Sequence, residues 1–289
     1  MMTPPVRAHR FHSALGSAVL AAIAGCSDYN VNSKAEPVDG AEPADSGLPD
    51  ADDSATPDDT DDSGIPGGSD ATEPDDPALA TATNYIHTSD QLFAWEPGTG
   101  ATAIAPFRDS SGSSVEITDL AIDLDGRMFA VGWSTLYTVD ASTARVSRVA
   151  DMDQSLVGLT FLSDGRLIGA GDGIFEVDTT TGALRALTSG GGYTTSGDVV
   201  GMPDGKLYWT VLGSFGDALV RIDPTTWSTT YVGEIGESSL WGIGEVGGNL
   251  TGFSSGGRLV EIDPTTARVS RSTTLPNAWW GATTNPVRW

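Results

Sequence analysis

The chain has 289 residues, of which 39% are hydrophobic and 19% charged, a composition that fits one or two globular domains. Its formal net charge is −24 at pH 7. No cluster of basic residues follows Arg10, so a nucleic-acid backbone would be repelled and nucleic acid is excluded as a partner.

The first 25 residues have the features of an export signal. Arg7 and Arg10 precede an apolar run from Ala14 to Ala24, which is too short to cross about 30 Å of hydrocarbon as a helix.

Ile23-Ala24-Gly25-Cys26 resembles the lipobox of bacterial lipoproteins, in which the cysteine is lipidated and becomes the new first residue. The resemblance implies a lipoprotein signal peptide over residues 1–25 and a lipid anchor, with chains such as palmitate, at Cys26. It places the protein in the bacterial cell envelope, and Ser27 favours the outer membrane. The alternative is a chance cysteine after an ordinary signal peptide.

Residues 26–80 are predicted to be a disordered, acidic linker rich in proline, aspartate and serine. Residues 27–80 hold sixteen acidic side chains and the single base Lys34, a charge of about −15, with almost no large apolar side chain. Such a segment cannot bury enough surface to offset the entropy lost on ordering. The linker would hold the folded part of the chain away from the membrane surface.

A turn phrase recurs at a nearly constant period after Ala80. The phrases LDGRM, SDGRL, PDGKL and GGNL place glycines at positions 126, 165, 205 and 248, at intervals of 39, 40 and 43 residues. This period is typical of propeller blades, whereas a β-sandwich, the other all-β option, would not explain it. In the first complete copy the predicted strands are ITDLAID, RMFAVG, TLYTVD and ARVSRVA.

Two kinds of turn join the predicted strands. The Asp-Gly turn after the first strand is expected to be a two-residue hairpin, in which φ is positive. The turn after the third strand reads Asp-Pro-Thr-Thr or a variant of it, and its aspartate is expected to accept hydrogen bonds at the first turn position. Because antiparallel strands alternate in direction, both kinds of turn should lie on one face of the fold.

The first and last copies of the repeat are each incomplete. NYIHTSDQLFAWEPGTGATAIAPF supplies the last three strands of a blade, and AWWGATTNPVRW supplies the first. We therefore predict an all-β fold over residues 81–289, a five-bladed β-propeller of four-stranded antiparallel blades closed by N- and C-terminal strands that share one blade. The predicted blades cover residues 81–107 with 277–289, 115–151, 155–188, 196–236 and 238–275.

The blade phrase resembles that of a known superfamily. LVRIDPTT at Leu219–Thr226 and LVEIDPTT at Leu259–Thr266 are similar to the blade motif of the bacterial gluconolactonase-like, NHL and quinoprotein-like propellers. The resemblance covers residues 81–289 and implies the propeller fold. It leaves the activity open, because such propellers include lactonases, lyases, dehydrogenases and binding proteins.

The face opposite the tight turns is expected to carry the binding residues, because its loops vary in length and composition. Trp133, Tyr193 and Phe215 lie in these loops. Alignment on the tight turns places Asp119, Asp198, Trp241 and Trp279 in one register at the start of the innermost strands, with Trp280 beside them. One interpretation is a ligand pocket in which the indoles stack on a ligand and the two aspartates accept hydrogen bonds or hold a divalent cation. The other is that the tryptophans fill the channel as core and the aspartates bind backbone amides of neighbouring blades.

The sequence gives little support for a catalytic activity. After signal removal His87, expected in a loop, is the only histidine. The favoured function is a non-enzymatic, monomeric binding module, attached to a membrane through Cys26, whose partner is a protein or a carbohydrate. The alternative is a cation-dependent hydrolase, lactonase-like or glycosidase-like, that uses Asp119 and Asp198 at the channel mouth. No cofactor is expected beyond Ca²⁺ or another divalent cation at these two aspartates.

Overall fold

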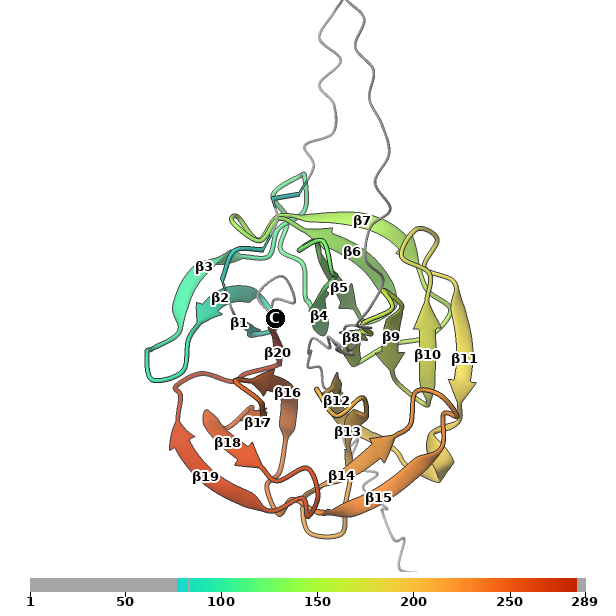
Figure 1. Ribbon diagram of the computed structural model, residues 1–289. Coiled ribbons are helices and arrows are strands. Elements are labelled where there is room, and N and C mark those ends of the chain that lie inside the picture. The colour runs from blue at the N-terminus through green and yellow to red at the C-terminus, as the bar shows by residue number, and fades with distance from the viewer. Residues whose placement is uncertain (1–76, 79, 83, 285–289) are drawn as a thin grey trace, which may run out of the picture.

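The protein is a five-bladed β-propeller, as predicted. The computed structural model describes residues 77–78, 80–82 and 84–284, and within these residues it contains twenty strands in five antiparallel sheets arranged around a central axis (Figure 1). The predicted signal peptide, Cys26 and residues 26–76 of the predicted linker lie outside the described residues. No described helix is both long and apolar enough to cross a membrane.

Each sheet is one blade, and we number the blades in chain order. Blade 1 has the strand order β20-β1-β2-β3, and the other four run outwards in sequence from β4, β8, β12 and β16. The bounds in blade 1 are β1 (Asn84–His87), β2 (Gln91–Trp95), β3 (Thr102–Pro106) and β20 (Gly281–Thr284); in blade 2, β4 (Asp119–Ile122), β5 (Met128–Gly132), β6 (Thr135–Val139) and β7 (Val146–Asp151). Those in blade 3 are β8 (Gly158–Phe161), β9 (Leu167–Ala170), β10 (Ile174–Val177) and β11 (Leu184–Thr188). Blade 4 has β12 (Thr195–Gly201), β13 (Leu207–Leu212), β14 (Asp217–Ile222) and β15 (Thr229–Glu234), and blade 5 has β16 (Leu240–Val246), β17 (Asn249–Ser254), β18 (Arg258–Ile262) and β19 (Val269–Thr274). A 3₁₀ turn, η1 (Gly190–Gly192), precedes blade 4.

Burial falls from the axis outwards. The innermost strands β4, β8 and β20 are buried at every residue, because each lies between two neighbouring blades. The outermost strand β19 is exposed at all but its first residue. The core is therefore made at the faces between blades, and no blade could bury both of its faces alone.

The Asp-Gly turns differ from the prediction. In the turn that contains Asp125 and Gly126, Asp123 N donates to Arg127 O at 2.9 Å and Gly126 N donates to Asp123 O at 3.0 Å. The loop therefore has three residues, of which Gly126 alone adopts a positive φ, of 84°. The turns at Gly165 and Gly205 have the same hydrogen bonds. The two-residue prediction was wrong for these three turns.

A two-residue hairpin occurs at one tight turn of this set, in blade 5. Val246 pairs with Asn249 across it, and Gly247 and Gly248 have φ values of 58° and 88°. Two successive positive φ values favour glycine at both positions, and both positions are glycine here. Blade 5 thus has one residue fewer in its first turn than blades 2, 3 and 4.

The turns after the third strands confirm the prediction for aspartate. In four blades the first turn residue is an aspartate whose carboxylate accepts a hydrogen bond from the amide two residues on. These pairs are Asp140 with Ser142 N at 2.8 Å, Asp178 with Thr180 N at 2.8 Å, Asp223 with Thr225 N at 2.9 Å and Asp263 with Thr265 N at 2.8 Å. The recurrent phrase is therefore a recurrent turn geometry.

Strand β20 closes the ring, as predicted. It pairs antiparallel with β1, with Asn84 opposite Thr284 and His87 opposite Gly281. Trp280 N extends this ladder by donating to His87 O at 2.8 Å.

The first described residues also contact the ring, since Ala80 N donates to Gly126 O at 2.8 Å. Ala80, placed at the end of the linker by the sequence, is buried against blade 2.

Candidate functional site

The innermost strands are in a different register from the one expected. A Cβ atom added to Gly158 would lie 3.2 Å from Asp198 Cα, one on Gly197 would lie 3.1 Å from Trp241 Cα, and one on Gly242 would lie 2.9 Å from Gly281 Cα. Because Gly197 is next to Trp241, Asp198 corresponds to Gly242 and not to Trp241. The short turn of blade 5 accounts for this shift of one residue, and Trp279 is two residues from the equivalent position.

Asp198 connects two blades. Its carboxylate is fully buried and accepts hydrogen bonds from Val199 N at 2.6 Å and from Ile243 N in blade 5 at 2.7 Å. Burial raises the pKa of Asp198 well above its ordinary value, and the two amide donors act in the opposite direction. Asp198 therefore has the second of the two roles considered from the sequence, that of binding backbone amides of a neighbouring blade.

Asp119 occupies the position in blade 2 that Asp198 occupies in blade 4. It is fully buried, and its carboxylate accepts a hydrogen bond from Leu120 N at 2.5 Å. Within the described part of the chain, no group of three or more His, Cys, Asp and Glu side chains lies close enough to hold a metal ion together. Cation binding by Asp119 and Asp198 stays a prediction.

Trp279 belongs to the core. It is fully buried, it meets Phe93 edge to face with ring centroids 5.2 Å apart, and its Nε1 donates to Leu275 O at 2.8 Å. Its neighbours come from blades 1 and 5, so the indole packs where the ring closes. This is the core role that the second interpretation gave to the tryptophans.

Trp241 and Trp280 come together at the start of the innermost strands. Both are half-buried, and their rings meet edge to face with centroids 5.5 Å apart. Trp241 Nε1 is buried and has no acceptor among the described residues. The structure thus brings two of the three predicted indoles together where β16 and β20 begin.

Trp133 lies on the loop between β5 and β6, where its φ is 54°. Its Nε1 donates to Glu116 Oε1 at 2.7 Å, and its carbonyl accepts a hydrogen bond from Leu156 N at 3.0 Å. The half-buried side chain is held on the surface of blade 2 by these contacts.

Tyr193 and Phe215 are both linked to the outermost strand of blade 4, β15. Tyr193 stacks on Tyr231 of β15, with centroids 6.2 Å apart and ring planes 19° apart. Tyr231 donates through its hydroxyl to Glu234 Oε1 at 2.8 Å, and the Glu234 carboxylate accepts the amide of Phe215 at 3.3 Å. We call Tyr193, Phe215, Tyr231 and Glu234 the blade 4 site.

The blade 4 site contains the most exposed large apolar side chain in the described part of the chain. Phe215 is 82% exposed, and Leu212 at the base of the same loop is 59% exposed. Tyr231 is 44% exposed. Three of the four exposed large apolar residues among those described therefore lie in one blade, a clustering that marks interaction surfaces.

The loop that carries Phe215 is fixed in place. Gly213 N donates to Gly216 O at 2.8 Å, and Ser214 N donates to Glu234 Oε1 at 3.0 Å. Next in the chain, buried Asp217 accepts hydrogen bonds from the Ser196 hydroxyl and from Leu240 N of blade 5, the latter at 2.6 Å. These hydrogen bonds hold the loop in a conformation that leaves the Phe215 side chain exposed.

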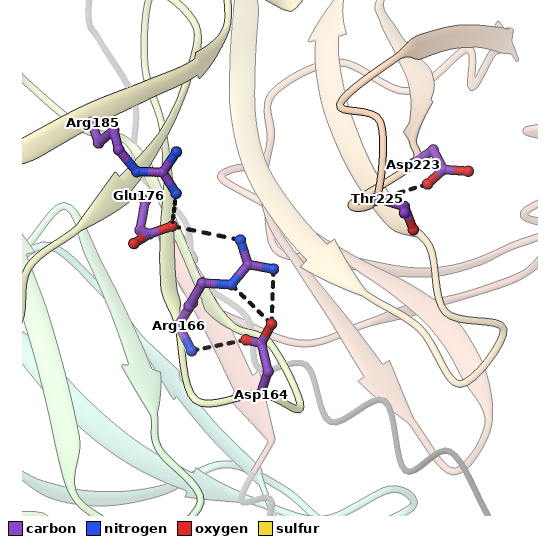
Figure 2. A network of polar contacts seen from close by, with 6 residues as sticks. All are labelled: Asp164, Arg166, Glu176, Arg185, Asp223 and Thr225. Carbon is purple, nitrogen blue, oxygen red and sulfur yellow. Dashed lines mark hydrogen bonds and ion pairs between the residues drawn. The ribbon is translucent and has the colours of Figure 1, made fainter.

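On the face that carries the Asp-Gly turns, charged side chains of blade 3 form ion pairs with one another (Figure 2). Arg166 Nε donates to Asp164 Oδ2 at 2.8 Å, and its Nη1 lies 3.5 Å from Glu176 Oε2, which also pairs with Arg185. The Arg166 guanidinium lies 5.6 Å from the ring centroid of Trp227. These contacts tie blades 3 and 4 together at their turns.

His87 and Glu245 are buried titratable groups whose burial was not expected from the sequence. His87 is the last residue of β1 rather than a loop residue, it is fully buried, and burial lowers its pKa to about 4. Burial raises the pKa of Glu245, at the end of β16, to about 7, and its Oε1 accepts the amide of Gly248. A buried, neutral His87 cannot reach a substrate, so it does not supply an accessible general base.

Comparison with known proteins supports the fold. No protein-family model matches the chain, and no curated protein matches it. A chain of the crystal structure of the nidogen/laminin complex is similar over 71% of this chain and 98% of its own length, with 14% identity and a TM-score of 0.51.

Two further solved structures are similar over a smaller part of their own length. TolB from Acinetobacter baumannii has 17% identity and a TM-score of 0.43, over 71% of this chain and 57% of TolB. Kuenenia stuttgartiensis hydrazine synthase has 16% identity and a TM-score of 0.37, over 55% of this chain and 49% of its own. This chain spans about half the length of each of these two. At 14% identity, the similarity to the chain of the nidogen/laminin complex is one of fold.

Proposed function

We propose that this chain is a lipid-anchored β-propeller of the bacterial cell envelope that binds a protein partner through the blade 4 site. The observation that carries the proposal is the 82% exposure of Phe215 on a loop whose backbone is held by hydrogen bonds. Aromatic side chains presented by a rigid loop are typical anchors of protein interfaces, because little entropy is lost when they bind. A chain of similar fold is part of the nidogen/laminin complex.

The anchor is supported by the sequence around Cys26. The export signal is supported by Arg7, Arg10 and the apolar run that follows them, whereas lipidation and an outer-membrane location depend on the resemblance of Ile23-Ala24-Gly25-Cys26 to a lipobox. More than one acyl chain at Cys26 would give stable attachment, at about 0.8 kcal/mol per buried CH₂ group. The acidic linker would then hold the propeller clear of the lipid.

We expect radioactive palmitate to label the chain in bacterial cells and the labelled protein to sediment with membranes. Cys26→Ala should carry no label and should appear in the fraction without membranes, because the chain has no second cysteine to modify. Label that survives in Cys26→Ala, or wild-type protein without label, would remove the lipid anchor from the proposal.

The docking surface is tested by photo-crosslinking in cells. A photoreactive phenylalanine analogue at position 215 should give one discrete crosslinked protein, whereas the same analogue at position 124 should give none. Leu124 is a matched control because it is 41% exposed but lies in an Asp-Gly turn, on the opposite face of the ring. Equal crosslinking from both positions, or none from 215, would contradict docking through blade 4.

A further inference from the structure

Among the residues that the structure describes, no cation pairs with the carboxylate of Glu234. Its carboxylate accepts hydrogen bonds from Ser214 N, the Tyr231 hydroxyl and Phe215 N, at 3.0, 2.8 and 3.3 Å. The Ser214 amide, followed by the Tyr231 hydroxyl, holds the pKa of Glu234 below its ordinary value, so the group is ionised at neutral pH. No Lys, Arg or His among the described residues forms an ion pair with it.

Its neighbour Glu237 provides the contrast. Glu237 lies three residues further along the chain, at the same end of blade 4, and its Oε1 pairs with Arg258 Nη1 at 2.9 Å. The side chains of Asp164 and Glu176 are also paired with arginines. An ionised carboxylate without an ion pair, beside an exposed phenylalanine, therefore sets the blade 4 site apart from these three paired carboxylates.

The tyrosines of the site suit a cation as well. Tyr193 and Tyr231 are stacked with planes 19° apart, and the negative faces of aromatic rings attract Lys and Arg side chains. The Tyr231 hydroxyl contacts Glu234, so the ring faces and the carboxylate belong to one hydrogen-bonded unit. A guanidinium or ammonium group placed there would meet ring faces and a negative charge together.

We infer that the partner presents a basic segment, in which a Lys or Arg side chain binds against Tyr193, Tyr231 and Glu234 while an adjacent apolar side chain packs on Phe215. This inference rests on the proposed function and names the chemistry of its partner. Charge complementarity favours such a partner, since residues 81–289 alone hold 23 acidic and 12 basic side chains, a net charge of −11. An anionic lipid surface would be repelled by the same charge.

Panning a displayed library of random peptides against the full chain tests the inference. The selected peptides should contain Lys or Arg next to an apolar residue, and their binding should be lost in Phe215→Ala. Replacing the basic residue of a selected peptide by Gln should weaken its binding about three- to fivefold, as for an exposed charge contact. Glu234→Gln should have an effect of the same size, and the two changes together should cost no more than either alone.

The controls separate the possible outcomes. Glu237→Gln makes the same change in charge at a carboxylate that is already paired, and it should leave peptide affinity unchanged within about twofold. The substitution in the peptide leaves the loop of Phe215 untouched, so the test does not depend on how well Glu234→Gln preserves that loop.

Phe215-dependent peptides without basic residues would overturn the basic partner but keep protein docking. Peptides insensitive to Phe215→Ala would contradict the proposed function itself. Phe215-dependent binding to phosphatidylglycerol vesicles would assign the site to a membrane and overturn the inference.

Discussion

A chain that ends at Pro276 should lose its cooperative unfolding transition. The truncation removes β20, which pairs with β1 and contacts the innermost strands β16 and β4, and it removes the buried Trp279. Loss of one buried tryptophan side chain costs about 3–5 kcal/mol, and a domain has only about 5–15 kcal/mol of stability in total. Removing a whole strand from a closed ring should therefore leave little stable structure. Thermal unfolding followed by circular dichroism would measure the loss.

A chain that ends at Thr284 is the matched control. It keeps all four pairs between β20 and β1 and every described contact of Trp279, so its melting temperature should stay close to that of the full chain. If the Pro276 truncation melted as cooperatively as this control, closure through β20 would not contribute to stability, and the ring would be held by other contacts.

Asp198→Ala should be the most damaging of the single substitutions considered. It leaves the buried amides of Val199 and Ile243 without their acceptor, and each unsatisfied buried donor costs about 1–3 kcal/mol. We expect a loss of about 3–5 kcal/mol in the free energy of unfolding, measured in urea. Asp198→Asn should also be destabilising, because its side chain offers one acceptor where two amides need one each.

Asp153→Ala serves as the control for Asp198→Ala. Asp153 is exposed in the connection between blades 2 and 3, so its removal should change the free energy of unfolding by no more than about 0.5 kcal/mol. If Asp198→Ala lost no more than Asp153→Ala, the bridge from blade 4 to blade 5 would be energetically unimportant. The carboxylate of Asp198 would then have no structural role.

The number and boundaries of the blades could be predicted from the sequence because they depend on local chemistry. Turn residues such as Asp125-Gly126 and Asp263-Pro264 mark where the chain reverses, and their period of about 40 residues counts the blades. The incomplete first and last copies predicted that β20 would pair with β1. None of these inferences required side chains from distant segments to be placed against one another.

The register of the innermost strands could not be predicted in the same way. Alignment on the turn glycines assumes turns of equal length, and the Gly247-Gly248 turn is one residue shorter than the turn at Gly126. A shift of one residue moves a side chain to the other face of a strand, which is why Gly242 stands where Trp241 was expected.

The blade 4 site was partly predictable. The length of the loop between β13 and β14 drew attention to Phe215, and Tyr193 was selected from the variable loop that precedes β12. Tyr231 and Glu234 were missed because their role depends on contacts among three separate segments, and an outer strand reading TTYVGE carries no signal for such contacts. A pairing of this kind becomes visible when the segments are seen together in space.

The pairing of β20 with β1 sets an order for folding. Strand β1 precedes its partner by four blades in the chain, and an N-terminal export signal would deliver it across the membrane first. The exported chain must therefore keep the apolar edge of its first blade unpaired until the residues up to Thr284 have followed. A helper protein that shields β1 during this interval would speed maturation, and premature pairing of β1 with a neighbouring chain would divert it to aggregates.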